Sequence, residues 1–392
     1  MISSPKGLWE RVVRGEPTAP AERLAAAGLW VLSVGYGLAL KAHLTAYRLG
    51  LARRTRFPVP VISVGNLTVG GTGKTTAALA VARWLQEQGR RVAYLSRGYR
   101  GHGENRALIV SEGLGPLLPV TAAGDEPYMV ARLLPEVFVL VGKDRRRTGA
   151  LALEKLGADA IVLDDGFQYQ RLARDLDLVL VDALMPFGYH CTEAAMAAAE
   201  PSGSGSKPTA CLLPRGLLRE PIANLTRADG VWLTHSDLVR RDDLEALRAR
   251  VQSLAPRSRV WEAAHIPVRL RQLGTDDEVE PEQLSGQLVC ALSSLGNPVA
   301  FERSLEKVGA EVVARLRFPD HYPYRADELR EALRAQPVEA RWVVTTEKDA
   351  VRIPQEALVR PVWALRVELA GRPGGPTLSE ELTCLVRGKR VM

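Results

Sequence analysis

One stretch of the sequence, PVPVISVGNLTVGGTGKTTAALAVARWL (residues 58–85), constrains the fold more than any other. Its first part, residues 58–66, is apolar and predicts a buried strand, and an amphipathic helix is predicted for residues 75–88. Between them lies a glycine-rich loop that ends in Gly-Lys-Thr. This order is that of a phosphate-binding loop, in which backbone N–H groups and the helix N-terminus hold phosphate oxygens.

The loop predicts a site for a nucleotide with Mg²⁺. Lys74 would reach the terminal phosphates and Thr75 would bind the metal ion. Thr68 stands where the general pattern has its first glycine, and the alternative is a glycine-rich turn that binds nothing. The residues expected to contact the nucleotide are Thr68, Val69, Gly70, Gly71, Thr72, Gly73, Lys74, Thr75 and Thr76.

The chain downstream of this loop alternates between apolar runs and helical segments. Strands are predicted for residues 90–98, 136–142, 158–166 and 176–183. Such a pattern predicts an α/β fold of the P-loop NTPase type, with a mostly parallel sheet covered by helices on both faces.

The organisation predicts three parts. Residues 1–56 form a basic, apolar segment, residues 57–265 the P-loop domain, and residues 266–392 a smaller α/β domain reached through extended linker strands near 256–275. A Gly/Ser-rich stretch, residues 193–210, is predicted to be an inserted surface loop.

Two carboxylates follow the predicted strand that contains AIVL. Asp164 and Asp165 stand where a Mg-nucleotide site needs an acidic residue, and one of them would contact Mg²⁺ directly or through water. The alternative is a turn residue or a helix cap, and the sequence leaves open which of the two meets the metal.

Charge and cysteine usage exclude several classes of function. The net charge is +7, and residues 1–60 carry nine Lys/Arg against three acidic residues, or +6 of it. The nearly neutral remainder excludes a general nucleic-acid-binding surface. The four cysteines form no C-x-x-C pair, which indicates reduced thiols rather than a disulfide framework or a zinc site.

The N-terminal region contains 17 residues without a charge, 24–40. About 20 apolar residues span a bilayer, so the run is at or just below that limit. A helix lying on the membrane surface, with flanking Arg/Lys and with Trp30 and Tyr36 at the interface, is one interpretation. A buried helix and a spanning helix are the alternatives.

Several short motifs, taken in order, resemble the tetraacyldisaccharide 4'-kinase family. Besides NLTVGGTGKT they are SRGYRG (96–101), GDEP (124–127), GKDRR (142–146), DDGFQYQRLARD (164–175), LLPRGLLREP (212–221), FPDHYPY (318–324) and TTEKDAV (345–351). Thr68 agrees with that family's own form of the loop. Residues 189–210 form a longer link than the corresponding one in the family. Arg215 occupies the variable position of the family's L-P-x-G segment.

The resemblance implies a kinase that transfers the γ-phosphate of ATP to the 4'-hydroxyl of an acylated glucosamine disaccharide 1-phosphate, giving lipid IV(A). It also implies a location on the cytoplasmic face of the bacterial inner membrane, in contact with its lipid surface. We expect a monomer that uses ATP and Mg²⁺ and binds no nucleic acid.

The resemblance also assigns residues. Asp125 matches the family's catalytic carboxylate and His321 the histidine paired with it, from the other half of the chain, so that the pair would form when the two halves approach. Glu126 would hold the metal or its water, although Asp125 and Glu126 also read as helix caps. The residues implied near the substrate are Arg97, Tyr99, Arg145, Arg219 and Glu220, for which packing or a solvated basic run is the alternative.

A second function from another class is a membrane-recruited P-loop switch ATPase or GTPase. It would share the phosphate loop, the paired aspartates and the apolar N-terminal segment. A GTPase would normally carry an N-K-x-D guanine motif, and the sequence has none. The FPDH loop, which a switch protein does not need, separates the two hypotheses in favour of the kinase.

Overall fold

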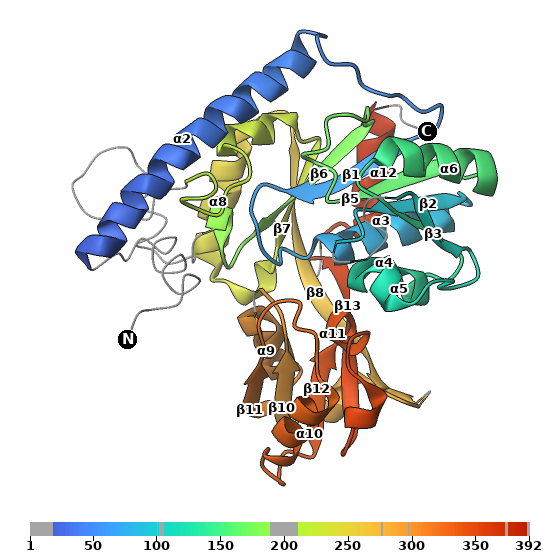
Figure 1. The fold of residues 1–392 in the computed structure, drawn as a ribbon, viewed down its shortest axis with the longest axis vertical. Coiled ribbons are helices and arrows are strands. Elements are labelled where there is room, and N and C mark those ends of the chain that lie inside the picture. The colour runs from blue at the N-terminus through green and yellow to red at the C-terminus, as the bar shows by residue number, and fades with distance from the viewer. Residues whose placement is uncertain are drawn as a thin grey trace.

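The computed structural model describes residues 19–99, 101, 106–188, 211–275, 277–296, 298–372 and 375–389 (Figure 1). The surface loop predicted for residues 193–210 lies outside these ranges.

Helices and strands alternate along most of the chain. The helices are α2 (Pro20–Arg48), α3 (Lys74–Glu87), α4 (Val120–Ala123), α5 (Asp125–Leu133), α6 (Arg145–Leu156), α8 (Arg241–Leu254), α9 (Pro298–Lys307), α10 (Ala326–Arg334), α11 (Glu347–Ala350) and α12 (Leu378–Lys389). The strands are β1 (Val61–Asn66), β2 (Val92–Ser96), β3 (Leu108–Glu112), β4 (Phe138–Val141), β5 (Ala160–Asp164), β6 (Leu176–Asp182), β7 (Gly230–Thr234), β8 (Arg259–Gln272), β9 (Glu278–Val279), β10 (Leu288–Ser293), β11 (Glu311–Arg317), β12 (Trp342–Thr346) and β13 (Val362–Gly371).

The strands form one mixed, mostly parallel sheet in the order β11-β10-β12-β13-β8-β7-β6-β1-β5-β2-β4-β3, with β9 beside β8. Strand β1 lies between β5 and β6 and is parallel to both. The pairs β3–β4, β8–β9 and β8–β13 are antiparallel. The predicted fold class is confirmed, whereas β3 and β7 are strands that the sequence-based interpretation does not include.

The central strands are buried throughout. Every residue of β1, β5 and β6 is buried, because helices cover both faces of this part of the sheet. Parallel strands end at the same edge, so the loops after β1, β5 and β6 gather there. Burial of the apolar strands therefore fixes the place where polar loop residues meet.

Strands β8 and β13 carry the sheet from the P-loop half of the molecule into the C-terminal half (Figure 1). The first part of β8 pairs with β7, and the part after Ala263 pairs with β13. The proposed boundary between residues 265 and 266 falls inside this strand. Helix α12 returns to the P-loop half, where Leu382, Leu385 and Val386 join the same core cluster as Trp232.

Helix α2 lies along the outside of the P-loop half (Figure 1). Its 29 residues are long enough and apolar enough to cross a membrane, by length and composition only. Only 6% of its most apolar window is buried. Leu24, Val31 and Leu38 follow one another at intervals of seven residues and are 76%, 62% and 65% exposed.

Candidate active site

The phosphate loop connects the end of β1 to the start of α3. Gly70 and Gly73 have φ values of +118° and +81°, a region of backbone conformation that strongly favours glycine. Inside the loop, Asn66 Nδ2 donates to Thr72 Oγ1 at 2.9 Å. A side chain on Gly73 would collide with the ring of His265, which comes from β8. The loop is therefore held by Asn66 from within and packs closely against His265 of β8.

Helix α3 begins at Lys74, so the free N–H groups of its first turn point toward the loop. Lys74 Nζ lies 3.5 Å from the carbonyl oxygen of Gly70. Burial lowers the pKa of Lys74, and the carboxylate of Asp165 acts in the opposite direction. Thr75, the second residue of the helix, is half-buried. The five residues from Gly71 to Thr75 lie in the loop and first turn, as the sequence predicts.

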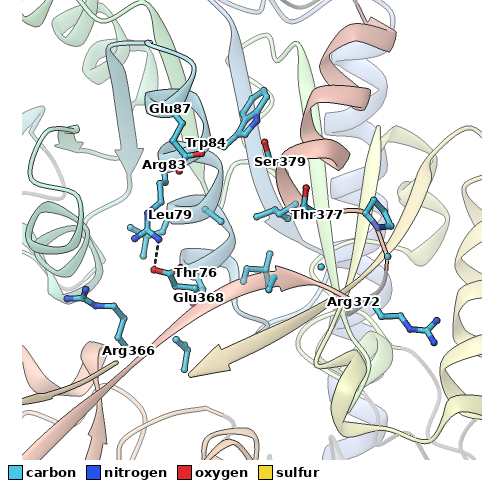
Figure 2. A pocket seen from close by; sticks show the side chains of 18 of the residues that line it. Thr76, Leu79, Arg83, Trp84, Glu87, Arg366, Glu368, Arg372, Thr377 and Ser379 are labelled. Atoms are coloured by element: carbon cyan, nitrogen blue, oxygen red, sulfur yellow. Dashed lines mark hydrogen bonds and ion pairs between the residues drawn. The ribbon is translucent and has the colours of Figure 1, made fainter. Parts of the chain in front are cut away.

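The side chain of Thr76 points elsewhere. It lines a cavity of about 470 Å³ between α3 and the end of β13, where Arg83 forms an ion pair with Glu368 (Figure 2). Of the predicted site residues, Thr76 is the only one that lines this cavity. Only the backbone N–H of Thr76, in the first turn of α3, can therefore point toward a phosphate in the loop.

The two aspartates after β5 have opposite electrostatic environments. Asp164 is 3% exposed, and burial together with the Glu126 and Asp165 carboxylates raises its pKa to about 7. Burial also raises the pKa of Asp165, but Lys74 and Arg219 outweigh it, and the net shift is downward. Asp165 has a positive φ of 52° and pairs with Arg219 Nη1 at 2.6 Å. Asp165 is thus an ionised partner of arginine, whereas the burial of the Asp164 carboxyl is offset by few favourable contacts.

Asp125 and His321 lie together although they are far apart in the sequence. Asp125 begins α5 in the P-loop half, and His321 lies in the C-terminal half with a positive φ of 56°. Nδ1 of His321 is 3.0 Å from Oδ2 of Asp125, and Arg352 Nε lies 3.2 Å from the same oxygen. The two halves are in contact at this point, so the pair is already formed in this structure.

Contact between the halves extends to the phosphate loop itself. A Cβ placed on Gly296, in the loop after β10, would lie 3.6 Å from the backbone nitrogen of Gly71 and 3.6 Å from Oδ2 of Asp320. The FPDH loop that contains His321 is therefore next to the loop expected to hold phosphates. The Asp125–His321 pair thus lies near the loop predicted to hold phosphates.

Lys348 and Arg352 are site residues that the sequence-based assignment missed. Lys348 Nζ lies 2.8 Å from Oε1 of Glu126 and 3.2 Å from Nε2 of His321. Burial lowers the pKa of Lys348, but the carboxylates of Glu126, Asp320 and Asp349 together raise it by more, so the ammonium stays charged. Burial raises the pKa of Glu126, but Lys348, with smaller effects from Lys74 and His321, brings the net shift downward. Lys348 lies in the TTEKDAV motif, which by itself indicates only a strand end and a helix cap, and Arg352 follows directly after that motif.

Three of the predicted substrate residues lie around this centre. Arg145 is only 6% exposed and its guanidinium lies 5.2 Å from the ring centre of Tyr169, so it does not belong to a solvated basic run. Arg97 and Tyr99 are exposed, and the ring of Tyr99 lies 5.8 Å from that of His321. Tyr99 therefore lies beside the Asp125–His321 pair.

The neighbours Arg219 and Glu220 differ in what they can reach. Arg219 faces Asp165, as described above. Glu220 is 1% exposed and accepts hydrogen bonds from Arg227 Nη2 and Asn224 Nδ2, both at 2.6 Å. A side chain buried in this way has no surface for a substrate to contact. The prediction that Glu220 contacts the substrate therefore does not agree with its buried position. Its hydrogen bonds instead stabilise the chain that follows Arg219.

Comparison with known proteins identifies the family. A family model described as LpxK, tetraacyldisaccharide-1-P 4'-kinase, matches residues 25–192 and 204–385. A tetraacyldisaccharide 4'-kinase of Anaeromyxobacter dehalogenans (strain 2CP-C) is 44% identical over 353 residues, 90% of this chain and 86% of the relative. One from Anaeromyxobacter sp. (strain Fw109-5) is 43% identical over 97% of both chains.

A solved structure agrees with these relatives. The crystal structure of the "apo" form of LpxK from Aquifex aeolicus in complex with ATP has a TM-score of 0.68 and 30% identity. The match covers 93% of this chain and 99% of that one. The chain belongs to the tetraacyldisaccharide-1-P 4'-kinase family.

Proposed function

We propose that this protein transfers the γ-phosphate of ATP to the 4'-hydroxyl of a tetraacyldisaccharide 1-phosphate, with Asp125 as the general base. The observation that carries the proposal is the Asp125–His321 pair next to the phosphate loop. A sugar hydroxyl is a weak nucleophile, so the reaction needs alignment, charge neutralisation and a proton acceptor. The site supplies a group for each of these needs.

The hydrogen-bond pattern supports Asp125 as that acceptor. An ammonium donates and cannot accept, so Nε2 of His321 accepts from Lys348 and Nδ1–H donates to Asp125. Among the described residues, His321 and Arg352 both contact Oδ2 of Asp125, which leaves Oδ1 to take the proton of the acceptor hydroxyl. The acceptor oxygen then bonds to the γ-phosphorus as the bond between that phosphorus and the bridging oxygen of ADP breaks. His321 thus orients the carboxylate.

The phosphate loop would hold the nucleotide. The N–H groups of residues 70–76 and the start of α3 suit phosphate oxygens, and Lys74 would neutralise charge on the transferring group. Arg145 is buried close to the two aspartates and is suited to the same charge or to that of the acceptor. Tyr99 lies beside His321, where the acceptor would approach Asp125, and Arg97 is two residues away in the same loop.

The residues present suit a Mg²⁺ ion. Oδ1 of Asp164 is buried with no hydrogen-bond partner in the described structure, a position that a cation would stabilise. Among the described residues no cluster of three or more His, Cys, Asp and Glu could hold a metal ion, which agrees with a site completed by phosphate and water. Thr75 and Asp164 would hold the ion, and Asp165 and Glu126 would act through water. When bound, Mg²⁺ neutralises charge on the phosphates.

Family membership and the exposed apolar helix α2 favour association with a membrane. We place the enzyme on the cytoplasmic face of the inner membrane, as a monomer, with α2 lying on the lipid surface. An acceptor with four acyl chains resides in a bilayer, while ATP is dissolved in the cytosol. An apolar helix beside the P-loop half would bring the site to the boundary between the bilayer and the cytosol.

The test is a phosphotransfer assay with the full-length protein, Mg-ATP and detergent-solubilised disaccharide 1-phosphate. We expect a product with one added phosphate and one ADP formed for each product molecule. The variant Lys74→Met should lose both ATP binding and transfer. Equal ADP formation with and without the acceptor would instead support the switch ATPase, and the kinase proposal would then be wrong.

A further inference from the structure

Helix α2 contacts the P-loop half of the molecule through a small polar face. Ser33 Oγ donates to the carbonyl oxygen of Leu212 at 2.6 Å, and Tyr36 Oη donates to that of Arg219 at 2.7 Å. Next to Tyr36, a Cβ on Gly37 would lie 3.0 Å from a methyl group of Leu212, so the helix backbone comes close to the loop. Residues three and four apart lie on one side of a helix, and these three therefore form a single docking face.

The loop that receives this face, residues 212–219, is closed on itself. Leu213 N donates to the carbonyl oxygen of Leu218 at 2.8 Å, and Gly216 N donates to that of Leu212 at 3.0 Å. These bonds connect the segment around Leu212, where Ser33 binds, to the other end of the loop. We call residues 212–219 the bridging loop.

The bridging loop pairs directly with the phosphate loop. Val69 N donates to the carbonyl oxygen of Leu217 at 2.8 Å, and Arg219 N donates to that of Leu67 at 2.7 Å. Thr68 and Leu218 form the antiparallel bridge between these two bonds. The backbone of residues 67–69 is thus held on one side by the bridging loop.

Arg219 joins the helix to the paired aspartates. Its carbonyl oxygen accepts from Tyr36, while its guanidinium nitrogen Nη1 lies 2.8 and 2.6 Å from the two carboxylate oxygens of Asp165. Burial and the Glu220 carboxylate raise the pKa of Tyr36, so its hydroxyl keeps the proton that it donates. One residue therefore connects α2 to both the phosphate loop and Asp165.

We infer that α2 is a positioning element of the active site as well as an apolar surface, and that Ser33 and Tyr36 set the geometry of the phosphate loop and Asp165 through the bridging loop. The apolar residues Val31 and Leu38 lie about half a turn away from Ser33 and Tyr36, on the opposite side of the helix. The two roles therefore belong to different side chains and can be separated by substitution. This inference rests on the proposed function for its kinetic readout only.

The experiment compares the double variant Ser33→Ala/Tyr36→Phe with two controls in the full-length protein. Tyr47→Phe removes a hydroxyl from the same helix, at a ring that contacts His43 and Arg54 instead. Val31→Gln/Leu38→Gln changes the opposite, exposed face. Each variant is measured for kcat and KM in detergent micelles, for hydrogen exchange, and for sedimentation with phosphatidylethanolamine/phosphatidylglycerol vesicles.

We expect the double variant to lower kcat by about fivefold for each hydrogen bond removed, because one such bond contributes about 1 kcal/mol. Amide exchange should become faster in peptides that cover residues 67–73 and 212–219, and vesicle sedimentation should not change. Tyr47→Phe should match the wild type throughout. Val31→Gln/Leu38→Gln should lose vesicle binding with unchanged kcat in micelles.

Wild-type kcat and wild-type exchange in the double variant would overturn the inference. Loss of vesicle binding in that variant, equal to the loss in Val31→Gln/Leu38→Gln, would also overturn it, because the docking face would then be a lipid contact. A wild-type protein with no acceptor-dependent phosphorylation would contradict the proposed function instead. The exchange measurement would still decide whether α2 holds the phosphate loop.

Discussion

Lys348 Nζ lies 3.2 Å from Nε2 of His321, on the side of the imidazole opposite to Asp125. The same ammonium pairs with Glu126, the residue after Asp125, at 2.8 Å. Lys348 thus contacts both the histidine of the pair and the neighbour of the carboxylate. Because an ammonium can only donate, Lys348 fixes the tautomer of His321 in which Nδ1–H faces Asp125, and its contact with Glu126 joins the two halves of the molecule.

Replacing Lys348 should therefore impair turnover more than substrate binding. We expect Lys348→Met to lower kcat by about 10- to 100-fold, because the imidazole loses its fixed tautomer and Glu126 loses its buried partner. Lys307→Met, which removes a surface ion pair with Asp237, should leave kcat unchanged. Steady-state kinetics with saturating ATP measures both, and equal kcat values for the two variants would refute the role given to Lys348.

Asp125 should matter for chemistry and little for nucleotide binding. Asp125→Asn keeps the shape and a hydrogen-bonding oxygen but removes the base, so we expect kcat to fall by about 10²–10⁴-fold. His321→Gln leaves the carboxylate in place and should cost less. ATP affinity, measured by calorimetry, should stay within about twofold for both, since neither residue belongs to the phosphate loop. A loss of less than tenfold in Asp125→Asn would exclude it as the general base.

Gly73 offers a test of the phosphate loop that separates backbone strain from steric collision. Gly73 has φ +81° and its missing side chain leaves room for His265, whereas Gly89 has φ +77° with open space around it. Gly89→Ala should destabilise the protein by about 1–2 kcal/mol and leave ATP affinity unchanged. Gly73→Ala should weaken ATP binding by at least about tenfold, because the loop must move away from the His265 ring.

The double variant Gly73→Ala/His265→Ala provides the control for that collision. Removing the imidazole frees the space, so ATP affinity should recover in part while the backbone strain remains. Calorimetric titration of the three variants distinguishes the two causes. If the double variant binds ATP no better than Gly73→Ala, contact with His265 is not what requires glycine here.

Patterns within short stretches of sequence predicted much of the fold. Apolar runs and the Gly-Lys-Thr loop placed β1, β2, β4, β5 and β6 and the helix after the loop, because burial on both faces demands continuous apolar strands. Strand β7, with Gly230 and Trp232, was missed since it has a short run and no motif. The return of α12 to the P-loop half depends on long-range packing against Trp232, which no local pattern encodes.

The site shows the same division between local and long-range information. The family motifs named Asp125 and His321, and the structure brings them together. Lys348 lies in the TTEKDAV motif and Arg352 directly follows it. The motif by itself predicts only a helix start, so only the approach of the two halves reveals the contacts of these two residues. Glu220 shows the opposite error, because a charged residue in a family motif was expected to meet substrate and is buried beside Arg227.

A buried carboxyl outside the site makes the stability of the protein depend on pH. Glu381 of α12 is 3% exposed, its Oε2 accepts a hydrogen bond from Trp232 Nε1 at 2.9 Å, and burial raises its pKa to about 7. The folded state therefore binds a proton more tightly than the unfolded state. Between the unfolded pKa and pH 7, stability falls as pH rises, because the buried carboxyl must ionise.

Replacing Glu381 by glutamine should remove this dependence. The amide oxygen still accepts from Trp232 and carries no charge at any pH, so Glu381→Gln should match the wild type near pH 5 and exceed it at pH 8. The shift in pKa corresponds to about 3 kcal/mol at most. Thermal unfolding followed by circular dichroism at several pH values measures the difference. A stability gain that is the same at pH 5 and pH 8 would mean that ionisation of Glu381 is not its cause.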